Sequence, residues 1–257
     1  MQDPHSSPTL PSSSEPPVWP ELGAATARPA SNGWHWLVDA FGFFKADIGI
    51  WIAMSLIYVI LMAVISSVPL LSMIAPILAP VFSGGLMMAC RRQDVEGKLV
   101  FNDLFAGFQQ KAGPLSLLGL IFLGLYFLWA VIVGLMGGGA FLQMGGMHAG
   151  QDPLVTLQGL GFVVVIGLLL LVPILMAQWF APGLVALHDV APLAACKLSL
   201  NACFKNSVPF LVFGCVVFPA AMLATLPAML GWLILLPVLI ASVYTSYKDV
   251  FQLNNPR

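Results

Sequence analysis

Charged residues are scarce in this chain. Asp, Glu, Lys and Arg make up 8% of its 257 residues, against roughly 25% in an average soluble domain. Hydrophobic residues make up 59% and gather in runs too long for the core helices of a soluble protein. The net charge of −1 gives no basic field that would attract nucleic acid. The sequence therefore predicts an all-α, polytopic membrane protein that has the lipid bilayer as its partner and binds no nucleic acid.

Two further patterns are missing. The four cysteines follow no CxxC spacing, so neither a disulfide framework nor a zinc site is expected, and they are interpreted as small buried hydrophobic residues. The N-terminus has no apolar segment of the kind found in signal peptides. Residues 1–31 instead carry seven prolines and six serines, which predicts a disordered tail because little apolar surface can be buried there.

The apolar runs predict a membrane domain over residues 32–251, followed by a short polar C-terminal tail at 252–257. A membrane-spanning helix needs about 20 apolar residues, and the runs divide at turn-forming residues. Six spans are predicted: 48–67, 70–90, 114–136, 160–180, 208–229 and 232–247. The fourth is expected to end just before the Pro182-Gly183 pair, where helices commonly break.

Three shorter segments show the spacing of an amphipathic helix, in which apolar residues recur every three or four positions. They begin near Trp34, Val100 and Ala191, and each precedes a pair of predicted spans. We expect them to lie on the membrane surface. Their apolar positions are Leu37, Ala40, Phe41 and Phe44 in the first, Phe101, Leu104, Phe105 and Phe108 in the second, and Cys196, Leu200, Cys203 and Phe204 in the third.

The basic residues are distributed unevenly among the segments between the spans. With six spans, all ten Lys and Arg residues fall on the side that also holds both termini. Loops rich in Lys and Arg stay in the cytoplasm. The sequence therefore predicts an inner-membrane protein of a bacterium, with both termini cytoplasmic.

The order of one amphipathic helix followed by an apolar hairpin occurs three times, which predicts an internal threefold repeat. The second span of each hairpin contains a similar tripeptide, Pro76-Ile77-Leu78, Pro173-Ile174-Leu175 or Pro237-Val238-Leu239, with an aromatic residue six or seven positions later. These prolines are expected to kink the helices. Kinked and repeated helices also occur in transporters, but no predicted span contains Asp, Glu, Lys, Arg or His, which usually mark ion coupling.

The candidate functional residues lie at the end of the fourth span. They are Gln178, Trp179, His188 and Asp189. A histidine beside a carboxylate could bind a cation or relay a proton. The alternative is structural, with Asp189 accepting hydrogen bonds from the free backbone donors at the start of the helix that contains Pro192.

Two other groups of residues are candidate binding sites. Arg91, Arg92, Lys197 and Lys205 belong to a basic rim that could recognise anionic lipid headgroups, although topology alone explains their position. The loop after the third span holds Met136, Met144, Met147 and His148, soft ligands of the kind that bind Cu(I). Because methionine is frequent throughout the chain, chance is the preferred explanation for this loop, and no cofactor is expected.

Residues on both sides of the fourth predicted span resemble an uncharacterised family of multi-pass inner-membrane proteins from proteobacteria. The resemblance is carried by Trp179-Phe180-Ala181-Pro182, Leu184-Val185, Leu187-His188-Asp189, Pro192-Leu193, Lys197, Ser199, Ala202, Lys205-Asn206 and Pro209-Phe210, and by residues 34–51 and 236–251. A more distant similarity is to the membrane domain that is fused to some glycerophosphodiester phosphodiesterases. No phosphodiesterase domain is present, and the family implies location and fold but no reaction.

The leading functional hypothesis is a non-enzymatic structural or interaction component of the cell envelope. No Ser/His/Asp, Cys/His or paired-carboxylate arrangement is placed where it could meet a soluble substrate. The alternative is a transporter or lipid-handling protein with a cavity between the proline-containing helices. A bundle packed to its axis would favour the first hypothesis, and a cavity between the second, fourth and sixth spans would favour the second.

Overall fold

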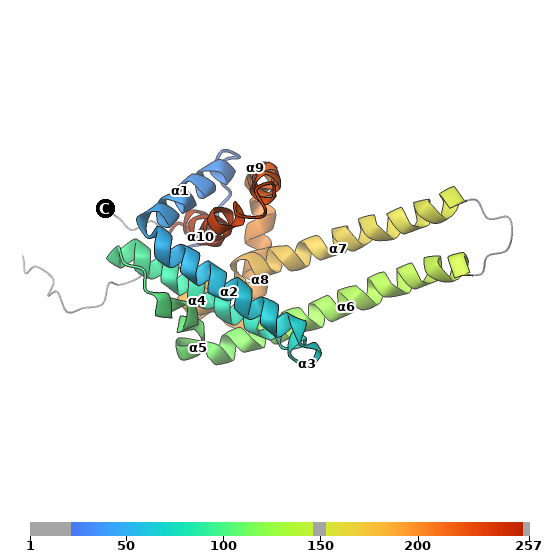
Figure 1. The fold of residues 1–257 in the computed structure, drawn as a ribbon, viewed down its shortest axis with the longest axis horizontal. Helices are drawn as coiled ribbons and strands as arrows, with labels where there is room; N and C mark the ends of the chain where they lie inside the picture. The colour runs from blue at the N-terminus through green and yellow to red at the C-terminus, as the bar shows by residue number, and fades with distance from the viewer. Residues whose placement is uncertain (1–21, 146–152, 254–257) are drawn as a thin grey trace, which may run out of the picture.

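The computed structural model of the chain describes residues 22–145 and 153–253, and all regular structure in these residues is helical (Figure 1). The helices are α1 (Asn32–Ala46), α2 (Ile48–Ser67), α3 (Pro69–Ser72), α4 (Ala75–Glu96), the 3-10 helix η1 (Phe101–Phe105), α5 (Ala106–Gln110), α6 (Ala112–Gly145), α7 (Pro153–His188), α8 (Pro192–Lys205), α9 (Ser207–Thr225) and α10 (Trp232–Val250). The all-α prediction is confirmed.

Five helices in the described residues are long and apolar enough to cross a membrane: α2, residues 112–138 of α6, residues 161–188 of α7, α9 and α10. The first predicted span, 48–67, coincides with α2. The second corresponds to α3 and α4, and α4 does not belong to the five because Arg91 and Arg92 interrupt its apolar sequence. The chain is thus a multi-pass membrane protein with an all-helical fold.

Helix α7 differs from the prediction at its C-terminal end. The fourth span was expected to end at residue 180, but α7 continues through Pro182 and Gly183 to His188. Proline deprives the helix of one backbone hydrogen bond, yet residues 180–187 are buried on all sides by neighbouring helices. Tertiary packing therefore outweighs the local tendency of the Pro-Gly pair to end the helix.

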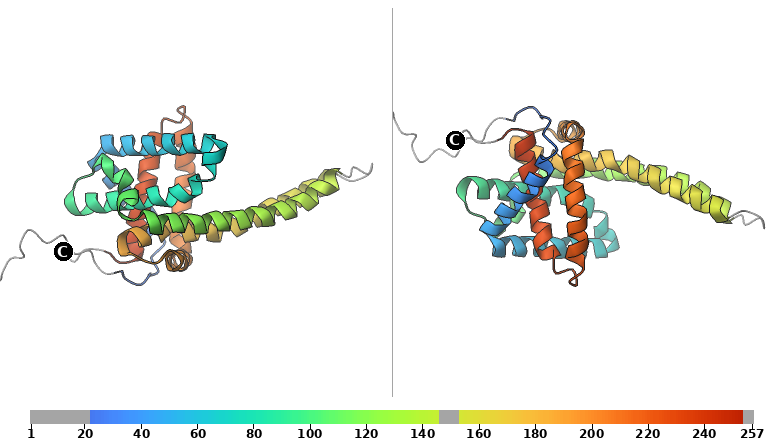
Figure 2. Two further views of the ribbon diagram at one scale, coloured as in Figure 1. Left: turned by 90° about the horizontal axis from the view of Figure 1, so that it is seen from below. Right: turned by 90° about the horizontal axis from the view of Figure 1, so that it is seen from above.

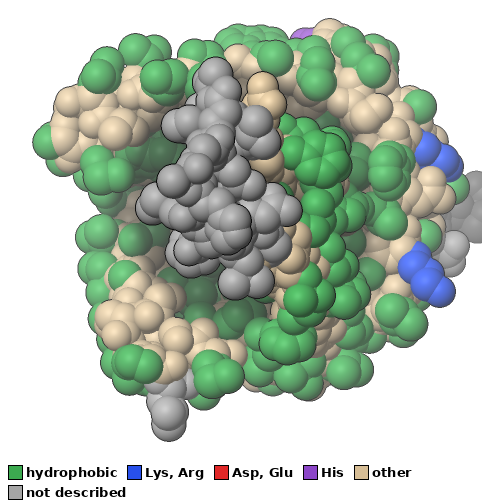
Figure 3. Space-filling model, turned by 90° about the vertical axis from the view of Figure 1, so that its right-hand side faces the viewer, with side chains coloured by type: hydrophobic (Ala, Val, Ile, Leu, Met, Phe, Trp, Pro, Cys, Tyr) green, Lys and Arg blue, Asp and Glu red, His purple; other side chains and the backbone are tan. Residues whose placement is uncertain are grey.

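Helices α6 and α7 form a long antiparallel hairpin that extends away from the other helices (Figure 1). They contain 34 and 36 residues, or about 51 and 54 Å at 1.5 Å per residue. The α9–α10 hairpin runs across the direction of α6 and α7 (Figure 2). Seen along the α6–α7 hairpin, the protein presents hydrophobic side chains over most of its face, and no Asp or Glu of the described residues is visible there (Figure 3).

Helix α4 lies at the centre and approaches its neighbours closely because glycines stand at the contacts. A Cβ atom on Gly107 of α5 would lie 2.0 Å from the Val81 carbonyl oxygen of α4, and one on Gly119 of α6 would lie 2.6 Å from the Ile77 Cα. Small residues allow such backbone contacts between membrane helices. Eleven residues of α4 are buried, so protein rather than lipid surrounds much of this helix.

The amphipathic segments pack against protein as well as carrying exposed faces. In α1, Trp36, Ala40 and Phe44 are buried, and the Trp36 ring lies 5.1 Å from that of Phe210 in α9. Phe41, expected on the same apolar face, is 40% exposed. In the second segment Leu104 is fully buried against α4, whereas the predicted partners Phe101 and Phe108 are over a third exposed.

The described helices follow the predicted order, in which α1, η1 with α5, and α8 each precede a hairpin. The internal threefold repeat stays a prediction, since the order of elements alone does not establish it. Residues before the predicted domain start at residue 32 also contact the helices. Residues 22–31 are held against α8, α9 and α10 by hydrogen bonds, and the remainder of the predicted tail lies outside the described residues.

The glycine contacts give the first prediction. Gly107→Ala should lower the unfolding temperature in detergent, because overpacking typically costs about 1–3 kcal/mol and the contacted atom belongs to the α4 backbone. The matched control is Gly113→Ala in α6, where a Cβ would meet no atom within 4 Å. Gly113→Ala should be neutral or stabilise by up to about 1 kcal/mol. Equal unfolding temperatures for the two variants would contradict the close α4–α5 approach.

Candidate functional site

His188 is the last residue of α7 and faces α10. Its Nδ1 atom lies 2.6 Å from the hydroxyl oxygen of Tyr247, and the two rings are 5.9 Å apart between centroids. Tyr247 is fully buried. A buried phenol needs a hydrogen-bond partner, so the His188–Tyr247 contact joins the end of α7 to α10.

Asp189 directly follows the last residue of α7. It adopts a left-handed backbone conformation with φ of 54°, and the Val190 N–H donates to the Leu184 carbonyl at 3.2 Å. The Asp189 carboxylate forms an ion pair with Lys111, which precedes α6. The predicted role of Asp189 as a cap of the next helix is wrong, because Ala191 holds the N-cap position of α8 without a side-chain hydrogen bond.

Gln178 and Trp179 face two further helices. The Tyr126 hydroxyl of α6 donates to Gln178 Oε1. The Trp179 indole N–H donates to Ser246 Oγ of α10 at 3.4 Å, and its ring lies 5.4 Å from that of Phe210 in α9. The contacts of the four candidate residues thus run to Tyr247, Lys111, Tyr126 and Ser246, and no two of them share one partner residue in these contacts. Each links α7 to an adjacent element.

The residues of the basic rim differ in their surroundings. Arg92 forms an ion pair with Asp103 of η1 and lies 3.9 Å from a Glu96 carboxylate oxygen. Together with Arg91 it borders a cavity of about 240 Å³ between α4 and the η1–α5 segment. On α8, Lys205 donates to the Ala25 carbonyl at 3.3 Å, and Lys197 is exposed.

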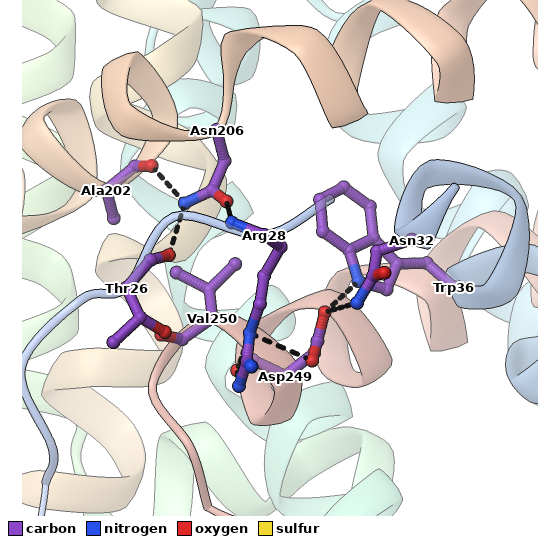
Figure 4. Close-up of polar contacts among 8 residues, drawn as sticks. All are labelled: Thr26, Arg28, Asn32, Trp36, Ala202, Asn206, Asp249 and Val250. Carbon is purple, nitrogen blue, oxygen red and sulfur yellow. Dashed lines mark hydrogen bonds and ion pairs between the residues drawn. The ribbon is translucent and has the colours of Figure 1, made fainter. Parts of the chain in front are cut away.

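A polar cluster that the sequence reasoning did not identify joins the N-terminal segment to the ends of α8 and α10 (Figure 4). Asp249 is its acidic member. Its Oδ1 lies 3.1 Å from Arg28 Nε, and its Oδ2 accepts hydrogen bonds from Asn32 Nδ2 at 2.7 Å and from the Trp36 indole at 2.8 Å. The carboxylate is thus charge-paired and hydrogen-bonded from α1 and from the segment before it.

Asn206 is the second member of this cluster and has no exposed surface. Its Oδ1 accepts from the Arg28 backbone N–H at 2.8 Å, and its Nδ2 donates to the carbonyls of Thr26 and Ala202, both at 2.9 Å. The N–H of Thr26 donates to the Val250 carbonyl at 3.0 Å. We call Thr26, Arg28, Asn206 and Asp249 the terminal clasp, because they join both ends of the described chain.

One sequence signal could have indicated the clasp. Asn206 separates an amphipathic helix from an apolar one, a position where a buried polar side chain can satisfy free backbone groups at a helix end. Its partners, however, are about 180 residues away in the sequence. No local pattern identifies contacts at that distance.

A larger cavity, of about 490 Å³, lies between α1 and α10. It is bordered by Asn32, His35, Trp36, Val38, Asp39, Gly42, Phe43, Thr245, Lys248 and Asp249. Two of its charged residues already have partners, because Lys248 pairs with Asp94 of α4 and Asp249 pairs with Arg28. His35 and Asp39 are exposed, and the cavity therefore presents a mixture of polar and apolar groups.

The cysteines in α8 are buried thiols. Burial raises the pKa of Cys196 to about 11 and that of Cys203 to about 12, which keeps both protonated at neutral pH. A thiolate, not a thiol, acts as nucleophile or metal ligand. The described residues contain no group of three His, Cys, Asp or Glu side chains that could hold a metal ion. Met147 and His148, in the loop that is a candidate Cu(I) site, lie outside the described residues.

Comparison with known proteins supports the membrane assignment. The chain is similar to a probable inner membrane protein of Burkholderia thailandensis, with 28% identity over 254 residues, covering 88% of this chain and 93% of the relative. No protein-family model matches the chain, and no solved structure matches it. The expected similarity to membrane domains fused to glycerophosphodiester phosphodiesterases is not among these findings.

The terminal clasp gives the second prediction. Asn206→Ala should lower the free energy of unfolding by roughly 1–3 kcal/mol, because the partly buried Arg28 N–H and Thr26 carbonyl lose their partner and an unsatisfied buried group costs about 1–3 kcal/mol. Hydrogen exchange at residues 25–28 should accelerate in the same variant. Asn201→Ala, which changes an exposed asparagine within α8, is the control and should change neither quantity. Unchanged exchange at residues 25–28 in Asn206→Ala would show that Asn206 does not hold the N-terminal segment.

Proposed function

We propose that this chain is a non-enzymatic integral protein of the bacterial inner membrane that acts as a structural or interaction component of the envelope. We further propose that six of its helices are inserted in the membrane and that both termini lie in the cytoplasm. The similarity to a probable inner membrane protein and the five apolar helices support its location.

Helix α4 is the sixth inserted helix in this proposal. Its lower hydropathy agrees with a position inside the bundle, because a helix surrounded by protein does not need an apolar face toward lipid on every side. Val81, Phe82, Leu86 and Cys90 are each at most 4% exposed. The arginines near its C-terminal end then lie on the cytoplasmic side.

The packing around α4, α7 and α10 is the observation that carries the proposed role. A Cβ on Gly183 of α7 would lie 2.5 Å from the Met87 side chain of α4 and 3.7 Å from the Tyr247 ring of α10. Ala181 and Ala241 are fully buried. Close contact between α4, α7 and α10 at Gly183 supports a scaffold over a protein that alternates between two open states.

A lipid-handling protein is the second candidate, favoured by one observation between α2 and α10. An apolar cavity of about 110 Å³ lies there, bordered by Ile52, Ser55, Leu56, Val59, Trp232, Leu233 and Leu236. Within the described residues the buried Ser55 hydroxyl has no hydrogen-bond partner. The cavity is small compared with the ~300–1,000 Å³ of typical ligand sites, and its lining comes from α2 and α10 alone.

Topology is tested by labelling single cysteines in a variant whose four native cysteines are replaced. Leu230→Cys, in the exposed turn between α9 and α10, should react with a membrane-impermeant maleimide in intact cells. Lys98→Cys, in the exposed segment after α4, should react only after the cells are permeabilised. The reverse pattern would place the basic segments outside the cell and overturn the proposed orientation.

The packing of α7 and α10 against α4 is tested in the same cysteine-free protein, purified in nanodiscs. Ala181→Cys and Ala241→Cys should stay unlabelled during the time in which Lys98→Cys, in the exposed segment after α4, reacts completely. A transporter that opens alternately to the two sides would expose these two buried positions to the reagent. Labelling of either buried position in the folded protein would favour the transporter hypothesis.

A further inference from the structure

Helix α8 has an outward face that combines lysines with exposed apolar side chains. Its buried residues are Ala195, Cys196, Ser199, Ala202 and Cys203. Leu193 and Phe204 are 58% and 57% exposed, and helical geometry places them in one stripe with the exposed Lys197. Asn201 and Lys205 lie beside that stripe. We call these five residues the α8 outer face.

The buried side of α8 holds this face in a fixed orientation. Ser199 Oγ donates to the Met176 carbonyl at 2.7 Å and accepts from the Phe180 N–H at 3.0 Å, so it bridges the backbone of α7. At the other end, Asn206 joins α8 to the N-terminal segment. The exposed side chains therefore project from a rigid helix rather than from a loop.

The charge of α8 is not balanced within the helix. It contains Lys197 and Lys205 and no Asp or Glu. The nearby carboxylates have partners elsewhere, because Asp189 pairs with Lys111 and Asp249 with Arg28. Within residues 22–145 and 153–253, Lys205 donates to a neutral carbonyl and forms no ion pair with a carboxylate.

The other amphipathic segments lack this combination. Helix α1 exposes Trp34, Val38 and Phe41, but Asp39 and Lys45 balance each other on it. The Arg92 charge beside η1 is opposed by Asp103 and Glu96. Of the segments expected at the membrane surface, α8 alone carries a net charge of +2 in the part of the chain that the structure describes.

We propose that the α8 outer face is a docking surface for anionic phospholipid headgroups. Exposed Leu193 and Phe204 would enter the boundary between headgroups and acyl chains, as the apolar residues of interfacial helices do. The aliphatic part of Lys197 would lie along them and its ammonium group would reach the phosphates. Lipid is the occupant that the face fits, because a soluble anion would use the lysines but leave the two apolar side chains exposed to water.

This inference rests on the proposed membrane function but can fail separately. The lipid preference of the face follows from charge complementarity, since a juxtamembrane Lys or Arg attracts anionic lipid. It also separates the predicted basic rim into two parts. Lys197 and Lys205 bind headgroups, whereas Arg92 is held in ion pairs within the protein.

The test measures lipid contact at the α8 outer face in the full-length chain. A bimane fluorophore is attached at Asn201→Cys in the cysteine-free protein, which is reconstituted in nanodiscs containing either brominated phosphatidylglycerol or brominated phosphatidylcholine. Bromine on the acyl chains quenches a fluorophore that lies at the membrane. Phosphatidylglycerol should quench more strongly at low salt, and Lys197→Gln with Lys205→Gln should reduce its relative association constant by about fivefold for each lysine.

Control variants separate the possible results. Lys98→Gln changes an exposed lysine outside α8 and should leave the preference unchanged. Phe204→Ser should weaken quenching by both lipids. Inorganic phosphate at matched ionic strength should not reduce quenching by phosphatidylglycerol more than sodium chloride does. A stronger effect of phosphate would identify a free-anion site and overturn the proposal.

Two other outcomes would also overturn it. Equal quenching by the two lipids would show that the lysines do not select anionic headgroups, and absent quenching would show that the face meets solvent or protein. A second fluorophore, at Phe127→Cys on the exposed surface of α6, reports on the membrane function itself. If Phe127→Cys is quenched by both lipids while Asn201→Cys is not, only the lipid-docking inference fails. If neither is quenched, the proposed membrane insertion fails.

Discussion

The close approach of neighbouring helices to α4 is the constraint on which the rest of the structure depends. Glycines on α5, α6 and α7 remove the side chains that would otherwise separate the backbones, and a Cβ on Gly107 would overlap the Val81 carbonyl. Association in lipid gains little from the hydrophobic effect, so helices depend on such contacts and on hydrogen bonds. With α4 enclosed, α2, α6, α7 and α10 take positions around it, and their remaining apolar surfaces face outward.

Hydrogen bonds and ion pairs connect the ends of these helices. Lys248 of α10 pairs with Asp94 of α4, and Lys111 before α6 pairs with Asp189 after α7. Inside the bundle, Gln93 accepts from the Trp51 indole and donates to the Phe43 carbonyl, which links α4 to α2 and α1. The polar residues of this hydrophobic chain thus serve mainly to hold elements together. That use of charge agrees with a scaffold or interaction protein, and the α8 lysines differ in that both lie exposed on one helix.

The sequence allowed much of the secondary structure to be predicted, because a uniformly apolar run of about 20 residues can form few structures other than a membrane helix. The span at 48–67 matches α2, and the helix at Pro192 was recognised by its period. The end of α7 was mispredicted, since Pro182 and Gly183 are helix breakers locally and only the surrounding helices keep the chain helical. His188 and Asp189 are adjacent in the sequence and were predicted as a pair. In the structure the His188 side chain contacts Tyr247 of α10, whereas the Asp189 side chain contacts Lys111 before α6.

The amino-acid sequence by itself determined the helical class, the membrane location and the gathering of basic residues between the apolar runs. These properties depend on composition and on spacing within about 20 residues. Only the tertiary structure decided which apolar faces meet protein and which remain exposed, because a protein core and a lipid bilayer are equally apolar and give the same periodicity. It also decided which charges are compensated, since the partner of Asp249 lies 221 residues away. Arg92 has acidic neighbours in the sequence, and only the tertiary structure decided that Asp103 and Glu96 are the ones beside it, because the chain has to fold back from α4 to η1 to bring Asp103 there.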